Sequence, residues 1–271
     1  MNLKDAYNYC VYFLSANGVD EAEFKALCLV CHLAGIRNNQ YEQHKSDTLA
    51  DALWRLKSGE PLQYVIGKWD FYETEFYVGK GVLIPRPETE ELTDLAVKKA
   101  RKLRSPVIYD LCAGSGWISI AKAVLNSEVF CIEKSSAAME YLVKNMQGVA
   151  NVHAVSADVL DIDSFKNITE NSIDLIVSNP PYIKSSEIPS LQKELSFEPE
   201  EALDGGKDGL DFYVYIIKEW KKFLRPGGLL LFEIGDEQVA DISGLLQQSH
   251  YKNISILNDM YGNPRIASAE K

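Results

Sequence analysis

The spacing of hydrophobic residues changes along the chain and separates a helical part from an alternating part. Up to about residue 60, apolar side chains recur at the spacing of one helical face, interrupted by polar and glycine-containing breaks. This pattern predicts a small N-terminal helical bundle. The expected helices are residues 3–16, a second helix capped by Asp20 and ending at Gly35, and residues 48–57.

From residue 106 onward, short apolar runs alternate with longer helical patterns. We expect strands at residues 107–111, 129–132, 152–155, 173–177 and 228–234, helices at 90–103, 117–125, 135–146, 210–224 and 236–248, and a closing hairpin of 253–257 with 265–269. Such alternation predicts an α/β fold with a mostly parallel sheet, helices on both faces and right-handed crossovers. The closing hairpin adds antiparallel strands at its C-terminal end.

An aromatic and β-branched stretch lies between these two parts. It predicts a short β-hairpin with arms at residues 63–72 and 76–78. The predicted organisation therefore has three sections. They are a helical docking domain at residues 1–60, a hairpin linker at 61–88 and an α/β domain at 89–271.

The linker ends in Pro85-Arg86-Pro87, where two prolines bracket an arginine. A residue before proline is biased toward extended backbone, so we expect a stiff loop that fixes Arg86 beside the domain joint. Thr89 is expected to cap the next helix, whose acidic first turn suits the helix dipole. Arg86, Pro87 and Thr89 are candidate residues of a substrate loop.

Composition and charge argue against some classes of protein. The 271 residues carry a formal charge of −11 and a pI near 4.9, which argues against a protein whose main task is to bind nucleic-acid phosphates. No apolar run reaches the length of a membrane span and no signal-peptide core is present, so we expect a cytoplasmic protein.

The short pattern Cys28-x-x-Cys31-His32 is interpreted as buried thiols on a helix. Because the five cysteines and four histidines form no ligand cluster in the sequence, we expect no metal.

Three acidic residues end successive predicted strands: Asp110, Glu133 and Asp158. A glycine-containing turn, Gly114-Ser115-Gly116, follows the first of them and lets backbone approach a ligand. An acid inside such a turn disfavours a pyrophosphate and favours a cationic ligand. S-adenosylmethionine fits, because its sulfonium and amino group are positive and its ribose and adenine offer donors to carboxylates. The order of these features predicts a class I, Rossmann-like methyltransferase fold.

The strand at residues 173–177 ends in Asn179-Pro180-Pro181-Tyr182. Two prolines stop the strand and form a stiff turn at its carboxyl end, where ligands bind in open α/β sheets. The turn offers an amide side chain, a carbonyl and an aromatic ring, which together can grip a planar nitrogen group. The candidate catalytic residues are Asn179, Pro180, Pro181 and Tyr182. The candidate cofactor-binding residues are Asp110, Cys112, Ala113, Gly114, Ser115, Gly116, Glu133, Asp158, Val159 and Asn179.

Over essentially its whole length, the chain resembles the protein-glutamine N5-methyltransferases that act on peptide-chain release factors. The resemblance is carried by residues 59–67, 83–90, 110–116, 179–182, 198–210 and 232–235 and by Arg265. It implies methyl transfer from S-adenosylmethionine to the glutamine amide of the Gly-Gly-Gln motif of a release factor, with N-terminal helices that hold the rest of that protein. The chain departs from the usual family pattern at Cys112, Ala113 and Glu133, where glycine, threonine and often aspartate are found.

The sequence is also compatible with other functions. One is methylation of a glutamine in a ribosomal protein, and another is methylation of adenine in DNA or RNA. The negative charge and the Pro-Arg-Pro loop argue against adenine, and an intact Asn-Pro-Pro-Tyr turn argues against a scaffold that has lost catalysis. The long connection at residues 183–209 has no convincing strand, and we expect it to form a substrate-side lid.

Overall fold

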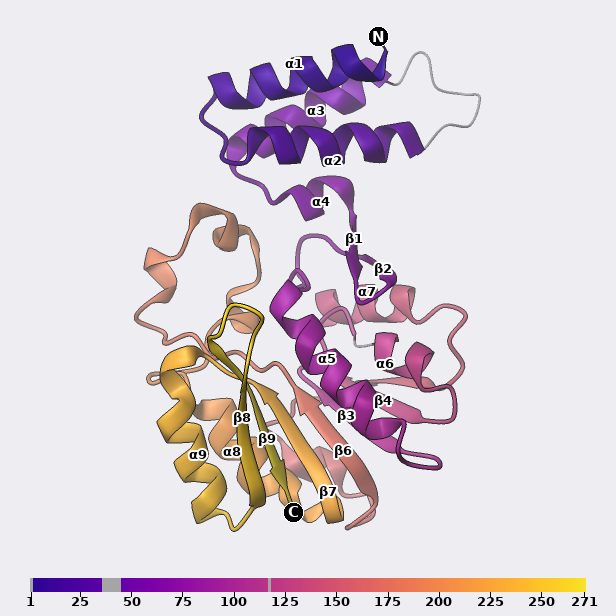
Figure 1. Ribbon diagram of the computed structural model, residues 1–271, viewed down its shortest axis with the longest axis vertical. Helices are drawn as coiled ribbons and strands as arrows, with labels where there is room; N and C mark the ends of the chain where they lie inside the picture. The colour runs from indigo at the N-terminus through magenta and orange to yellow at the C-terminus, as the bar shows by residue number, and fades with distance from the viewer. Residues whose placement is uncertain (1, 36–44, 117) are drawn as a thin grey trace.

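The computed structural model describes residues 2–35, 45–116 and 118–271. Its N-terminal helices are α1 (Leu3–Ala16), α2 (Ala22–Gly35) and α3 (Lys45–Ser58). The three helices lie together at one end of the molecule (Figure 1). They pack around a buried cluster that includes Cys10, Leu29 and Leu53. The predicted bundle is therefore present. The interpretation of Cys28 and Cys31 as buried is wrong, because Cys28 is half-buried and Cys31 is exposed on α2.

The linker contains a helical turn as well as a hairpin. Residues 63–66, predicted as strand, belong to α4 (Leu62–Ile66), which Gly67 ends in the left-handed conformation at φ 78°. The hairpin consists only of β1 (Lys68–Phe71) and β2 (Thr74–Tyr77). Its register starts at the pair Lys68 and Tyr77, so residues 63–66 face no strand. Burial of α4 against the N-terminal helices outweighs the local β propensity.

A seven-stranded sheet forms the centre of the rest of the chain, in the order β5-β4-β3-β6-β7-β9-β8. The first five strands in this order are parallel, and β9 is antiparallel to both β7 and β8, as predicted. Their bounds are β3 (Val107–Leu111), β4 (Glu128–Glu133), β5 (Val152–Ser156), β6 (Ile173–Ser178), β7 (Leu224–Glu233), β8 (Lys252–Asn258) and β9 (Pro264–Glu270). β7 begins four residues earlier than predicted, because Leu224 pairs with Ile173 before the register shifts.

Helices cover both faces of the sheet (Figure 1). Leu92, Ile120 and Leu142 on one side belong to one buried cluster, while Phe212 and Ile242 on the other belong to a second. The helices are α5 (Pro87–Ala100), α6 (Ile118–Ala123), α7 (Ser136–Asn145), α8 (Asp211–Glu219) and α9 (Val239–Gln248). Residues 220–222 and 236–238, predicted as α-helix, form short 3₁₀ turns instead. Trp117, predicted to begin a helix, lies outside the described residues.

The helix after the Pro-Arg-Pro loop begins earlier than the sequence suggests. Pro87 is its first residue and Arg86 is its N-cap, so Thr89 does not cap it. A proline fits the first helical position because its missing N–H would have no partner there. The Thr89 side chain is thereby released for a contact with the sheet.

The connection at residues 183–209 is folded onto the rest of the chain. It contains three 3₁₀ turns, Ile188–Ser190, Lys193–Phe197 and Glu200–Ala202, and a single bridge between Ile183 and Asp204. Glu194 accepts a hydrogen bond from Lys25 of α2 at 2.6 Å. The connection therefore contacts the N-terminal helices as well as the α/β part. Among the helices of the described ranges, none is both long and apolar enough to cross a bilayer.

Candidate active site

A hollow of about 920 Å³, open to solvent, lies at the carboxyl ends of β3, β4, β5 and β6. Its wall includes the glycine turn after β3, the acids after β4 and β5 and the turn after β6, so the sheet topology brings these predicted residues together. The candidate residues from the sequence that line it are Arg86, Thr89, Cys112, Ala113, Gly114, Ser115, Gly116, Glu133, Asp158, Val159, Asn179 and Pro181. We call it the first hollow.

The turn after β3 is held in an unusual backbone shape. Gly114 and Gly116 have φ of 57° and 93°, a region that glycine enters without steric cost. Cys112 also has a positive φ, 62°, which a side chain makes unfavourable. Burial raises the pKa of the Cys112 thiol well above its usual value, and the nearby carboxylates of Glu133 and Asp110 add to the rise. The thiol is therefore neutral and unreactive at physiological pH.

Glu133 is fixed by backbone donors. Its Oε2 accepts from the Gly114 N–H at 2.8 Å and its Oε1 from the Ser135 N–H at 2.7 Å. The residue is only 8% exposed, and burial raises the pKa of its carboxyl while these N–H bonds oppose the rise. The Lys134 backbone N–H also lowers the pKa of this carboxyl, and three donors leave one of its four lone-pair sites available. Glu133 thus shapes the glycine turn and can still accept a hydroxyl donor from the hollow.

The other two acids take different places. Asp158 lies at the edge of the first hollow, where its Oδ1 accepts from the Leu160 N–H at 2.9 Å and its Oδ2 lies 3.5 Å from Lys134 Nζ. Asp110 is 1% exposed inside β3 and is not among the residues that line the hollow. The structure therefore brings two of the three strand-end acids to the cavity wall and places the third beneath the turn.

The Asn-Pro-Pro-Tyr turn separates the first hollow from a second one. The second hollow, of about 560 Å³ and also open to solvent, is lined by Asn179, Pro180, Tyr182 and Glu233 among others. Asn179 and Arg86 line both hollows, which places them at the boundary. Burial raises the pKa of Tyr182 to about 12, so its ring carries a neutral hydroxyl. Of the remaining candidates, Pro87 lines neither hollow.

Side chains from distant elements hold this boundary in place. Asn179 Nδ2 donates to Thr89 Oγ1 at 3.2 Å, and the Thr89 hydroxyl donates to Glu233 Oε2 at 2.6 Å. Arg86 forms an ion pair with Glu198, whose other oxygen accepts from the Ile84 N–H at 2.9 Å. Glu198 is buried, so this pair fastens the 183–209 connection to the loop before α5.

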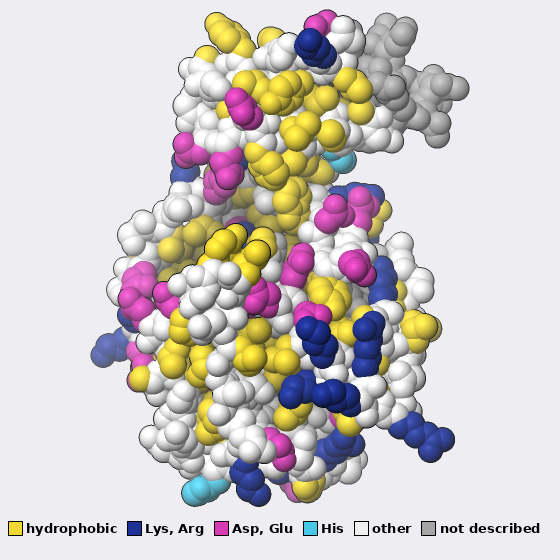
Figure 2. Space-filling view, viewed as in Figure 1, with side chains coloured by type: hydrophobic (Ala, Val, Ile, Leu, Met, Phe, Trp, Pro, Cys, Tyr) yellow, Lys and Arg dark blue, Asp and Glu magenta, His cyan; other side chains and the backbone are white. Residues whose placement is uncertain are grey.

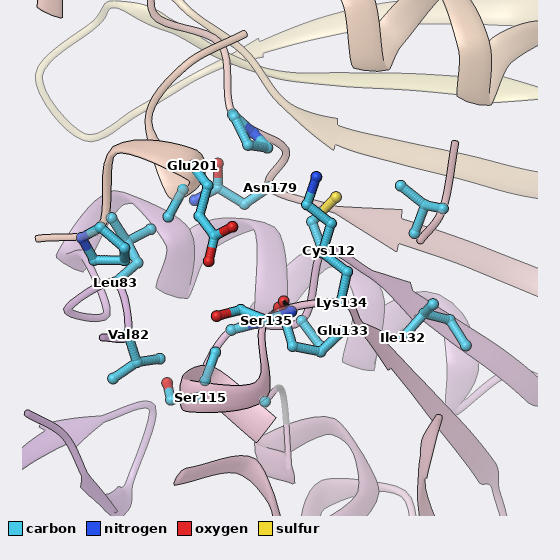
Figure 3. A pocket seen from close by; sticks show the side chains of 18 of the residues that line it. Val82, Leu83, Cys112, Ser115, Ile132, Glu133, Lys134, Ser135, Asn179 and Glu201 are labelled. Atoms are coloured by element: carbon cyan, nitrogen blue, oxygen red, sulfur yellow. Dashed lines mark hydrogen bonds between the residues drawn. The ribbon is translucent and has the colours of Figure 1, made fainter. Parts of the chain in front are cut away.

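Several lining residues were not predicted. Figure 3 shows Glu201 and Asn179 projecting into the first hollow, with Glu133 and Ser135 lower in the same view. Glu201 comes from the 183–209 connection, where neither periodicity nor a strand end marks it. Leu83, Lys134 and Phe212 also line the hollow. Lys134 and Ser135 could have been found by extending the strand-end argument one or two residues beyond Glu133. Within the described ranges, no three His, Cys, Asp or Glu side chains are grouped so as to hold a metal ion.

Two family models and several curated proteins match the sequence of this chain. Residues 5–67 match the family model described as PrmC N-terminal domain, and residues 88–208 match the methyltransferase small domain. A release factor glutamine methyltransferase of Thermodesulfovibrio yellowstonii is 35% identical over 257 residues, covering 90% of each chain. One of Bacillus anthracis is 32% identical over 286 residues, covering 100% of this chain and 99% of its own.

Solved structures show the same fold. A methyltransferase of Pyrococcus furiosus superposes with a TM-score of 0.51 at 19% identity, covering 72% of this chain and 87% of its own. At that identity the likeness concerns the fold alone. The full-length sequence similarity is the stronger finding, and it shows that the chain belongs to the release factor glutamine methyltransferase family, a family of S-adenosylmethionine-dependent enzymes.

Proposed function

We propose that this protein transfers a methyl group from S-adenosylmethionine to the side-chain amide nitrogen of the glutamine in the Gly-Gly-Gln motif of peptide-chain release factors. The observation that carries the proposal is the meeting of two hollows at Asn179. One is suited to a cofactor, the other to an acceptor side chain, and an amide group stands between them. Family membership supports the choice of a release factor as the acceptor protein.

The residues of the first hollow fit S-adenosylmethionine. Three carboxylates, Glu133, Asp158 and Glu201, line a cavity whose other surfaces are largely apolar, including Ile132 and Phe212. Carboxylates suit a ligand with positive groups and hydroxyl donors, while the apolar surface suits a flat aromatic base. When bound, the cofactor supplies an electrophilic methyl carbon on a positively charged sulfur. We assign its binding to the first hollow, with Glu133 as the carboxylate that accepts from a ribose hydroxyl.

The second hollow can position an amide. Asn179 Oδ1 and the carbonyl of Pro180 are acceptors for the two N–H bonds of a glutamine amide, and the Tyr182 ring offers a face for its plane. An amide nitrogen is a poor nucleophile because its lone pair is delocalised into the carbonyl. Holding both N–H bonds aims that lone pair at one point, which is the main catalytic contribution we assign to these residues. No strong base is required, because the methylated nitrogen loses its proton readily.

We assign substrate docking to the predicted helical domain, residues 1–60, with the linker at 61–88 and the methyltransferase domain at 89–271. Figure 2 shows hydrophobic side chains gathered over the N-terminal helices, and Phe24 and Leu27 of α2 are among the exposed ones. The connection at residues 183–209 is proposed as the substrate-side lid. Its ion pairs with Lys25 and Arg86 support this role, because they join it to the docking helices and to the site.

A labelling experiment tests this function. The protein is incubated with methyl-labelled S-adenosylmethionine and a release factor, the same factor with its motif glutamine changed to alanine, a ribosomal-protein fraction, or adenine-containing DNA. We expect label only in the unaltered release factor. Label in DNA or in a ribosomal protein instead would contradict the proposal. Since release factors act on ribosomes, the proposed substrate also supports a cytoplasmic location.

A further inference from the structure

The Asn179 side chain is oriented by residues that do not belong to its own turn. Its Nδ2 donates to Thr89 Oγ1 at 3.2 Å, and Thr89 lies in the first turn of α5. Thr89 in turn donates to Glu233 Oε2 at 2.6 Å. Both partners are almost fully buried, with Thr89 4% and Glu233 2% exposed. Three side chains joined by hydrogen bonds, those of Asn179, Thr89 and Glu233, therefore hold the boundary between the two hollows.

The sheet register explains why Glu233 is available there. β6 and β7 are parallel neighbours in which Ser178 pairs with Phe232. The next residues along the two strands are Asn179 and Glu233, which consequently lie side by side at the carboxyl edge of the sheet. Thr89 reaches this edge because α5 begins at Pro87 and packs over β6 and β7.

The donors and acceptors available on Glu233, Thr89 and Asn179 decide which group donates in each of the two hydrogen bonds. An ionised carboxylate only accepts, and a hydroxyl has a single proton. Once Thr89 donates that proton to Glu233, its oxygen offers only lone pairs to Asn179. Those lone pairs can be approached only by the NH₂ end of the asparagine amide, whose orientation is thus decided by its partners. The carbonyl end, Oδ1, is then turned away from Thr89.

We propose that Thr89 and Glu233 are positioning residues for methyl transfer, which keep the Asn179 carbonyl oxygen presented to the acceptor amide. The proposal rests on the proposed function, since it assumes that a primary amide is the group to be held. If Asn179 were to turn over, its NH₂ group would face the N–H bonds of the acceptor, and the clamp would become repulsive. A turned amide therefore lowers turnover while the first hollow keeps its shape.

Charged and titratable groups from four elements face Glu233. Arg86 and Glu88 come from the start of α5, Arg265 from β9, Tyr182 from the turn after β6 and Tyr213 from α8. Burial raises the pKa of Glu233 to about 7, while the Thr89 hydrogen bond and the two arginines oppose the rise. Tyr213 donates its hydroxyl to the Glu233 backbone carbonyl at 2.8 Å, which helps to fix the end of β7. The two arginines favour the ionised form of Glu233, which is the form that only accepts hydrogen bonds and so fixes the direction of the Thr89 hydrogen bond.

Substitutions at Thr89 test the proposal. Thr89→Val keeps the shape of the side chain and removes the hydroxyl, so we expect kcat to fall about tenfold to a hundredfold with little change in cofactor affinity. Thr89→Ser keeps the hydroxyl and is expected to stay within about threefold of wild type. Thr93→Val is the matched control, because Thr93 is also buried on α5 but donates only to the Thr89 backbone carbonyl at 3.0 Å. Its kcat should remain close to that of wild type.

A second variant and a double-mutant cycle separate positioning from general stability. Glu233→Gln keeps the volume but can present either a donor or an acceptor to Thr89, and we expect kcat to fall about tenfold. In an Asn179→Ala background, Thr89→Val should cost nothing further, because its effect passes through Asn179. The proposal is overturned if Thr89→Val keeps its kcat, if Thr89→Ser loses as much as Thr89→Val, or if the two losses add fully. Failure of the wild-type protein to methylate glutamine would instead overturn the proposed function.

Discussion

The two walls of the site are built in different ways. On the wall of the first hollow, Glu133 is fixed by backbone N–H groups of Gly114 and Ser135, at most 19 residues away in sequence. At the boundary of the second hollow, Asn179 is fixed by the Thr89 side chain, 90 residues away, and Thr89 by Glu233, 144 residues away. One wall is local and backbone-held. The other is assembled from distant side chains.

This difference predicts that substitutions at the two walls affect different properties of the enzyme. A backbone-held carboxylate keeps its place when side chains elsewhere change, because its donors belong to the chain itself. A side-chain-held amide depends on every member of the contact chain. Substitutions at the first wall should therefore affect cofactor binding, while those at the second should affect turnover.

The largest effect is expected for Asn179→Ala. Removing the amide deletes one acceptor of the clamp, and we expect kcat to fall about a hundredfold or more while cofactor affinity stays nearly unchanged. Turnover with a release factor and calorimetric cofactor binding are the two measurements. If turnover stayed within about threefold of wild type, the role of Asn179 in positioning would be wrong.

Glu133→Ala should show the opposite pattern. Loss of the charge-assisted bond to the cofactor is expected to weaken its binding about tenfold to a hundredfold, as measured by calorimetry. The variant also leaves the Gly114 and Ser135 N–H groups without their acceptor, so its thermal stability is recorded in parallel. Glu128→Ala is the matched control, since Glu128 lies at the exposed, opposite end of β4. Equal cofactor affinity in Glu133→Ala and wild type would remove its ribose role.

The pH dependence of turnover sharpens the comparison further. Glu233, with its pKa raised to about 7, is a carboxylate above that pH and protonated below it. Protonation lets Glu233 donate to Thr89, which removes the fixed direction of the contacts to Asn179. We therefore expect kcat at saturating substrates to fall as the pH drops through about 7 and to be flatter in Glu233→Gln. A wild-type profile as flat as that of Glu233→Gln would count against this role.

The smallest effect concerns the backbone of the glycine turn. Cys112 has φ 62°, so a glycine there should relieve strain. Comparing Cys112→Gly with Cys112→Ala removes the thiol in both and isolates the backbone term. We expect the glycine variant to be more stable by about 1 kcal/mol, measured by denaturant unfolding. If the alanine variant were the more stable one, the strain argument would fail.

The same contrast explains what the sequence could predict. The alternation of strands and helices specified the parallel sheet, because its period depends only on local pattern. The strand-end acids Glu133 and Asp158 were found for the same reason, since parallel strands end at one edge. Asp110 fits this rule in sequence but is buried, because the sheet register places it opposite Cys131, two residues before the strand-end position of Glu133.

The predictions that were wrong or missing concern contacts between residues that lie far apart in the sequence. Thr89 was predicted to cap a helix because an acidic helical turn follows it in sequence, but the structure pairs its hydroxyl with Glu233 on a strand far along the chain. Residues 63–66 were predicted as strand from their β-branched and aromatic side chains, although packing on the N-terminal helices makes them helical. Glu201 lines the first hollow but belongs to the connection at residues 183–209, whose sequence has neither helical nor strand periodicity. Local patterns carry no information about such partners.

The most direct test of the central claim is the chemical identity of the methylated atom. A release factor is incubated with the protein and S-adenosylmethionine, digested, and analysed by tandem mass spectrometry of the peptide that contains Gly-Gly-Gln. We predict the mass of one methyl group on the glutamine side-chain nitrogen, absent when the Asn179→Ala variant replaces wild type. A methyl group on any other residue, or undiminished modification by Asn179→Ala, would contradict it.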